Sequence, residues 1–156
     1  MYFSILRGIT AALRRPAALP LVVAVALVAA GCASSEDTKF VDGYNAAVTP
    51  LSTTMSRVSS SPGGDPVAVS KSLDQVADRL VDVRADLAAL DPPEDAAAEF
   101  DRMLGALNKG TKQVRAMARA TKHGDLKRLS KVTADFSATG TELVTIEQEL
   151  RTIVES

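Results

Sequence analysis

The side chains that most often carry catalysis or bind metal ions are scarce in this 156-residue chain, which has one histidine, His123, and one cysteine, Cys32. A serine triad needs a histidine base held by a carboxylate. His123 is instead expected in the last turn of a helix, beside Gly124, where its imidazole would interact with the helix dipole. A single cysteine and a single histidine exclude a disulfide framework, a four-cysteine zinc site and a multi-histidine metal centre. The G-x-S-x-G, Gly-rich phosphate-loop and H-E-x-x-H motifs are missing too. We therefore expect no catalytic residue, no cofactor, no metal site and no enzymatic activity.

Carboxylates recur at every fourth position of one predicted helix, on the face opposite its apolar stripe. They are Asp74, Asp78, Asp82 and Asp86. Clustered carboxylates attract Ca²⁺, but a straight helix offers only about two ligands at one point, whereas Ca²⁺ takes six to eight. The spacing therefore favours a solvated acidic face over a cation site. Met55, Met103 and Met117 are too few and too scattered to capture copper, and they are expected to fill core space.

The first 31 residues have the pattern of an export signal. Residues 1–15 carry three arginines and no acid, and residues 17–31 form an uncharged apolar run that stops at Cys32. A basic segment, an apolar segment of this length and small residues at its end are typical of a cleaved signal peptide. The run is shorter than the roughly 20 residues that span a bilayer. Arg14-Arg15 would suit twin-arginine export, but Pro16 follows and no Phe-Leu comes after it, so the sequence favours general secretion over that alternative.

The end of the apolar run is more specific. Residues 28–32, Val-Ala-Ala-Gly-Cys, resemble the bacterial lipobox, with Ala29 where that pattern usually has leucine. The resemblance implies that the thiol of Cys32 receives a diacylglycerol, that the signal is cut between Gly31 and Cys32, and that the lipid holds the protein on the extracytoplasmic face of the cell membrane. It divides the chain into a removed signal (1–31), a lipidated tether (32–37) and a folded domain (38–156). The alternative is an ordinary secretory signal followed by a free cysteine.

Apolar residues spaced alternately by four and three predict helices throughout the rest of the chain. One helix is expected over 66–90, with Asp65 as N-cap and Pro66 at its first position. The next is expected to begin at once, with Asp91 and Glu94 as a capping box, and to end at Gly124. Its stripe and that of the preceding helix are Val69, Leu73, Val76, Leu80, Val83, Leu87 and Leu90, then Phe100, Leu104, Leu107, Thr111, Val114, Ala118 and Thr121.

Two further helices flank this pair. The segment 38–58 places Phe40, Tyr44, Ala47, Leu51, Met55 and Val58 on one face, with a kink expected at Pro50. The last segment is capped by Asp125 and is either one helix or two that meet at Gly140. Its stripe is Leu129, Val132, Phe136, Thr139, Leu143, Ile146, Leu150 and Ile153.

No segment alternates with the period of a strand, so the sequence predicts an all-α fold. Four amphipathic helices with short connections favour an antiparallel up-down-up-down four-helix bundle after the signal segment. Its core would be aliphatic, with Phe40, Tyr44, Phe100 and Phe136 as its rings. The alanine-rich helices and the Leu87-x-x-Leu90-Asp91-Pro92-Pro93 turn resemble those of small helical lipoproteins of unknown function from high-GC Gram-positive bacteria. That resemblance implies no activity.

Charge is divided along the chain. The formal net charge of −1 excludes a strongly basic nucleic-acid binder. Residues 82–101 nevertheless hold seven acids and one base, whereas residues 109–131 hold eight bases and one acid. In the predicted topology the acidic part lies near the anchored end and the basic part lies away from it. A surface for an anionic envelope polymer or an acidic protein partner is predicted at Lys112, Arg115, Arg119, Lys122, Lys127, Arg128 and Lys131. The alternative is a solvated basic face that only balances the acidic helix.

These features predict a non-enzymatic binding or scaffold module that contacts an envelope component or a membrane-protein partner. A second hypothesis is a carrier of a small apolar ligand within the bundle. The threonines and glycines of 105–121 and 139–141 would leave the cavity that a carrier needs, unless they only mark imperfect packing.

Overall fold

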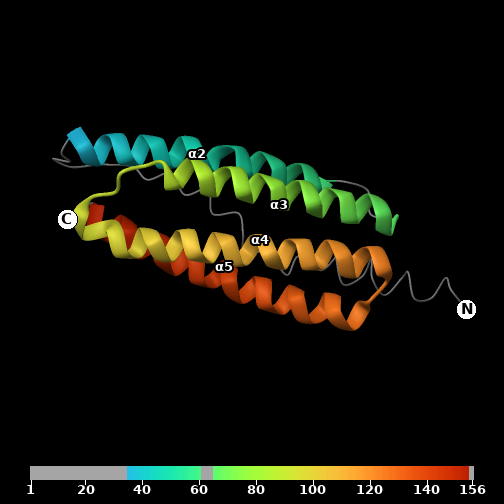
Figure 1. Ribbon diagram of the computed structural model, residues 1–156. Coiled ribbons are helices and arrows are strands. Elements are labelled where there is room, and N and C mark those ends of the chain that lie inside the picture. The colour runs from blue at the N-terminus through green and yellow to red at the C-terminus, as the bar shows by residue number, and fades with distance from the viewer. Residues whose placement is uncertain (1–34, 61–64, 155–156) are drawn as a thin grey trace, which may run out of the picture.

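The computed structural model describes residues 35–60 and 65–154. These form helices α2 (Ser35–Ser60), α3 (Pro66–Ala88), α4 (Ala97–His123) and α5 (Leu126–Val154), with a short 3-10 helix, η1 (Glu94–Ala96), before α4. Successive helices run in opposite directions and pack side by side (Figure 1). The predicted antiparallel four-helix bundle is confirmed, and the described residues contain no strand. The lipobox-like segment, with Gly31 and Cys32, lies outside the described residues.

The alternating directions define two ends of the bundle (Figure 1). We call the end where α2 begins the near end. It also holds the connection from α3 to α4 and the last turns of α5. We call the other end, with the turn between α4 and α5 and the start of α3, the far end. The acidic segment 82–101 therefore lies toward the near end and the turn at Gly124 lies at the far end.

The start of α3 follows the sequence prediction. Asp65 has an extended backbone and its Oδ1 accepts a hydrogen bond from the Val67 N–H at 3.0 Å. Pro66 occupies the first helical position, where a missing N–H costs nothing.

The start of α4 differs from the prediction. Pro93 has an extended backbone, with φ −51° and ψ 145°, so the chain cannot turn into a helix at residue 91. The Asp91–Glu94 capping box was therefore a wrong prediction. One turn of 3-10 helix comes first, and α4 begins only at Ala97, without a side-chain cap. Pro93 also follows Pro92 directly, and a residue that precedes proline avoids the helical conformation, so Pro92 cannot serve as the first helical residue.

The turn from α4 to α5 follows the prediction. Gly124 adopts the left-handed conformation, with φ +67°, and the N–H of Asp125 donates to the Ala120 carbonyl at 2.9 Å. Asp125 then caps α5 by accepting a hydrogen bond from the Arg128 N–H. Of the two alternatives for the last segment, one continuous helix is correct, since α5 runs through the buried Gly140. Likewise, α2 continues as one helix past Pro50.

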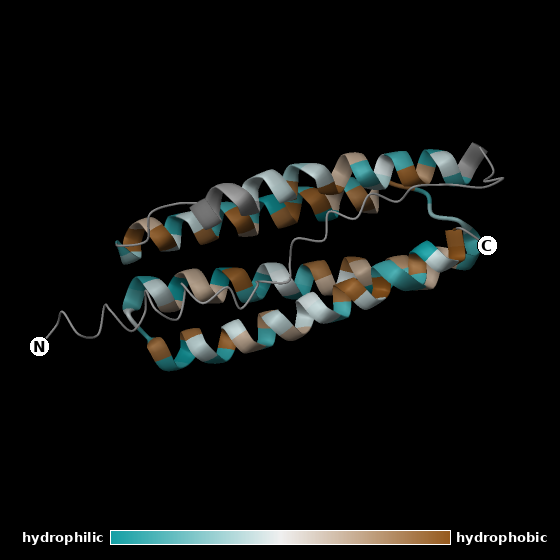
Figure 2. Ribbon diagram, turned by 180° about the vertical axis from the view of Figure 1, so that it is seen from behind, coloured by the Kyte–Doolittle hydropathy of each residue, from teal (hydrophilic) through white to brown (hydrophobic). Residues whose placement is uncertain are grey.

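The core is tight at the near end. The Phe40 ring on α2 meets the Phe100 ring on α4 edge-on, with centroids 5.3 Å apart, and Tyr44 lies beside Phe40. All four predicted core rings are buried. Of the three methionines expected to fill core space, Met103 is buried and Met117 is partly buried, whereas the side chain of Met55 is outside the described part. Apolar and polar segments alternate along every helix (Figure 2), as the stripes require. Thr139 and five aliphatic side chains are almost wholly buried: Leu87, Ile146, Leu150, Val83 and Val114.

Packing is looser at the far end. Along residues 126–135 of α5, only Leu129 and Val132 are even partly buried. At the start of α3, residues 65–68 are exposed, and the first two stripe residues, Val69 and Leu73, are only partly buried. The apolar stripes of α3 and α5 are therefore continuous in sequence, but their burial decreases toward the far end, whereas α4 remains buried as far as Ala118 and Ala120.

Candidate functional site

The predicted basic surface lies on α4 and α5, on both sides of the Gly124 turn. All seven side chains are exposed. Two of them have partners: Arg115 Nη2 lies 3.2 Å from Asp78 Oδ1 on α3, and Lys131 Nζ lies 3.0 Å from Asp135 Oδ2 one turn further along α5. Exposed pairs of this kind are weak but compensate charge locally. Arg115 and Lys131 are therefore less available to a partner than the sequence predicted.

The other five bases have no carboxylate within ion-pair distance in the part of the chain that the structure describes. We call them the free bases. They are Lys112, Arg119, Lys122, Lys127 and Arg128. The last four flank the Gly124 turn within a few residues, so the unpaired positive charge concentrates at the far end.

The acidic face of α3 is solvated. All four of its aspartates are exposed. Asp78 pairs with Arg115, and Asp82 lies 3.5 Å from Arg79 on the same helix. Within residues 35–60 and 65–154, no group of three or more histidine, cysteine or carboxylate side chains is placed to hold a metal ion. His123 is exposed in the last turn of α4, the position predicted for it.

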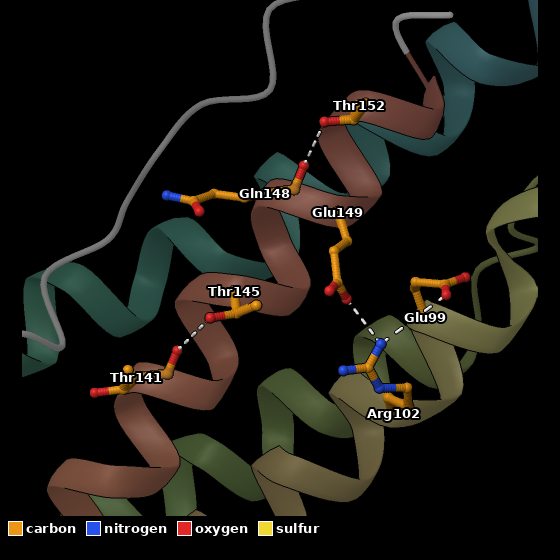
Figure 3. Close-up of polar contacts among 7 residues, drawn as sticks. All are labelled: Glu99, Arg102, Thr141, Thr145, Gln148, Glu149 and Thr152. Carbon is orange, nitrogen blue, oxygen red and sulfur yellow. Dashed lines mark hydrogen bonds and ion pairs between the residues drawn. The ribbon is translucent and has the colours of Figure 1, made fainter.

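Ion pairs join α4 to α5 toward the near end. Arg102 Nη1 lies 2.7 Å from Glu149 Oε2 on α5 and 4.0 Å from Glu99 Oε1 on its own helix (Figure 3). Lys109 Nζ lies 3.1 Å from Glu142 Oε2. These contacts compensate the exposed acids of α5, so the near end presents less free negative charge than its composition suggests.

A buried polar cluster at the near end was missed by the sequence analysis. Glu147 on α5 is only 7% exposed and Tyr44 on α2 only 4%. Burial raises the pKa of Glu147 to about 7, although the positive charge of Arg151 opposes the increase. Burial also raises the pKa of Tyr44, and the charge of Glu147 raises it further. We call these three side chains the α2–α5 cluster.

Two atoms of the α2–α5 cluster are buried without a hydrogen bond to any residue in the described ranges. They are Glu147 Oε1 and Arg151 Nη2. Buried polar atoms are nearly always paired, so two complementary unpaired atoms on one helix are unusual. The sequence signal for this cluster is faint. Glu147 directly follows Ile146 of the apolar stripe, and only packing against a second helix buries that flanking position.

Three of the small residues proposed to line a ligand cavity, Gly110, Thr111 and Thr139, make contacts within and between helices instead. A Cβ atom built on Gly110 would lie 3.7 Å from Phe136 Cε2 and 3.9 Å from Thr139 Cγ2, both on α5. These are ordinary contacts, so the α5 side chains already fill the space beside the glycine. The Thr111 hydroxyl donates to the Leu107 carbonyl, and that of Thr139 donates to the Asp135 carbonyl.

No protein-family model matches the chain, and no curated protein or solved structure is significantly similar to it. Among the described helices, none has the length and apolar character needed to cross a bilayer.

Proposed function

We propose that this protein is a lipid-anchored, extracytoplasmic binding module without enzymatic activity, which meets an anionic partner through the far end of its helical bundle. The export pattern and the lipobox-like residues ending at Cys32 support the anchor. The concentration of free bases around the Gly124 turn supports the binding surface, and it is the observation on which the proposal mainly rests.

An anchor on Cys32 would give the two ends of the bundle different surroundings. The first bundle helix, α2, begins three residues after Cys32, so a lipid on Cys32 would hold the near end at the membrane. The 27 residues of α4 correspond to about 40 Å, which separates the Gly124 turn from that end. Acidic residues near the membrane would be repelled by anionic headgroups and would help the bundle stand away from them. The free bases would then face outward.

The expected partner is an anionic envelope polymer or an acidic protein. Exposed lysines and arginines attract such partners over a distance of about one Debye length, roughly 8 Å at physiological salt. Because all seven basic side chains are exposed, binding should be moderate in strength and should weaken as salt increases.

Retention of the protein on an immobilised anionic cell-wall polysaccharide, measured across a salt series, tests the binding surface. Arg119→Glu with Lys122→Glu should abolish retention at low salt. A matched double variant, Lys39→Glu with Arg84→Glu, makes the same charge change at two exposed positions away from the Gly124 turn and should be retained. Equal loss in both variants would overturn the assigned surface. No retention of the wild type at low salt would exclude the polymer and leave an acidic protein as the partner.

A further inference from the structure

Apolar side chains are exposed at the far end of the bundle. Within the described residues three large apolar side chains are exposed, and two of them lie at this end: Val67 in the first turn of α3, at 60%, and Leu126 at the start of α5, at 47%. Leu129 and Val132, the next residues of the α5 stripe, are only partly buried. Figure 2 shows the start of α5 in brown. The far end therefore has apolar surface to cover as well as positive charge.

Free bases lie among these apolar residues. Lys127 and Arg128 stand between Leu126 and Leu129 in the first turn of α5, and the last turns of α4 supply two more free bases before the Gly124 turn. A surface that combines positive and apolar side chains is complementary to a partner that combines carboxylates with apolar side chains.

We propose that the first turns of α5 are a docking face for an acidic amphipathic helix of a protein partner. The carboxylates of the partner pair with the free bases, and its apolar side chains cover Leu126 and Leu129. This docking rests on the proposed function and names the kind of anionic partner that the far end binds.

The form of this face suits a helix. Leu126, Leu129 and Val132 follow one another at intervals of three residues, so they lie along one broad side of α5 within about two turns. The helix that packs beside α5 here is α4 (Figure 1), and the exposure of Leu126 shows that no described helix covers it. An amphipathic helix that docks on an apolar face presents its own anchors at spacings of three and four residues. The partner would thus add one more helix to this end of the bundle.

The apolar residues distinguish such a partner from a charged polymer. A polysaccharide with anionic groups can pair with the free bases, but it offers few apolar groups to cover Leu126. Its binding depends on charge and weakens steeply as salt screens that charge. An amphipathic helix also gains from the burial of apolar surface, which does not depend on screening. Its affinity should therefore persist to higher salt than that of a polymer.

Two synthetic peptides test the docking face. Both carry the same glutamates; one has leucines along one helical face, and the other has alanines in their place. The full chain is held in phosphatidylglycerol nanodiscs, whose negative charge repels both peptides, and binding is followed by the fluorescence anisotropy of a dye on the peptide. At physiological salt the leucine peptide should bind about tenfold more tightly than the alanine peptide, because it buries apolar surface.

Leu126→Ser should remove most of this preference. The side chain is exposed, so the variant should fold like the wild type. Val81→Ser is the matched control, because Val81 has nearly the same exposure, 43%, but lies in the middle of α3; this variant should keep the preference. Equal affinity of the wild type for the two peptides, or an unchanged preference in Leu126→Ser, would overturn the docking face.

The same measurements separate a failure of the docking face from a failure of the proposed function. Arg119→Glu with Lys122→Glu should weaken the binding of both peptides. If the wild type binds both equally and this variant binds neither, the basic surface is supported and the docking face is wrong. If neither peptide binds at low salt but an anionic polysaccharide does, the partner is a polymer and the docking face is again wrong. If the variant binds both peptides as well as the wild type does, the basic surface itself is wrong.

Discussion

Leu90 occupies the space beside Gly43: a Cβ atom at position 43 would lie 2.7 Å from Leu90 Cδ2. This contact brings α2 close to the residues that follow α3 at the near end. Gly43→Val should lower the unfolding free energy by about 1–3 kcal/mol, because a branched side chain adds volume to a filled contact. Gly43→Ala should be much milder, since the terminal methyl of Leu90 can rotate away. Urea unfolding of both variants measures the difference, and equal costs would argue against the contact.

Three other glycines should respond in opposite directions. Gly105→Ala should raise the unfolding free energy by about 1 kcal/mol, because its Cβ meets nothing within 4 Å and alanine is the better helix former. Gly110→Ala should also stabilise, because its Cβ would make only ordinary contacts with α5. Gly124→Ala should destabilise by roughly 1 kcal/mol, because φ is +67° there. Thermal unfolding followed by circular dichroism distinguishes these outcomes; a loss of stability in Gly105→Ala would contradict the open space at that position.

Two neighbouring residues on α3 test the register of the helix. Leu80 is 2% exposed, whereas Val81 is 43% exposed. Leu80→Asp should cost at least about 3 kcal/mol, because it buries a charge without a partner. Val81→Asp places the same charge in solvent and should change stability by about 0.5 kcal/mol or less. If the two variants lose the same amount in a denaturant titration, the assigned register is wrong.

The lipid anchor is tested by mass. Cys32→Ala should prevent both the attachment of diacylglycerol and cleavage after Gly31, because both steps need the cysteine. Intact-protein mass spectrometry and detergent phase partitioning of protein from a bacterial host measure these events. A mass difference that equals the substitution alone, with both proteins in the aqueous phase, would contradict the anchor and favour an ordinary secretory signal.

Local signals were sufficient to predict much of this fold. The caps Asp65, Gly124 and Asp125 were predictable because capping depends only on residues nearby in the sequence. The stripe from Val76 to Leu87 was predictable because its spacing is that of one face of a helix. The start of α4 was misplaced because the prediction considered only capping residues. Pro93 keeps Pro92 out of the helical conformation, and this effect of the second proline could have been noticed in the sequence.

The site was harder to predict because it depends on how helices pack together. The pairing of Arg115 with Asp78 is set by the register between α3 and α4, which no local pattern encodes. Glu147 looked like one more surface acid, since a stripe shows which side of a helix faces the core but not how far burial extends beyond its edges. The burial of Glu147 becomes visible only when the helices are packed together.

Because the apolar stripes are buried unevenly, local stability is expected to differ between the two ends of the bundle. Phe40, Phe100 and Leu150 clamp the near end, whereas Leu129 and Val132 remain partly open to water where the free bases gather. Local opening requires little free energy where few apolar contacts are lost, so the first turns of α5 should fray while the near end stays closed. The surface proposed to bind a partner is thus also the part of the bundle that can most easily change its shape. A partner that covers Leu129 and Val132 would bury apolar surface, and this burial would stabilise the changed conformation.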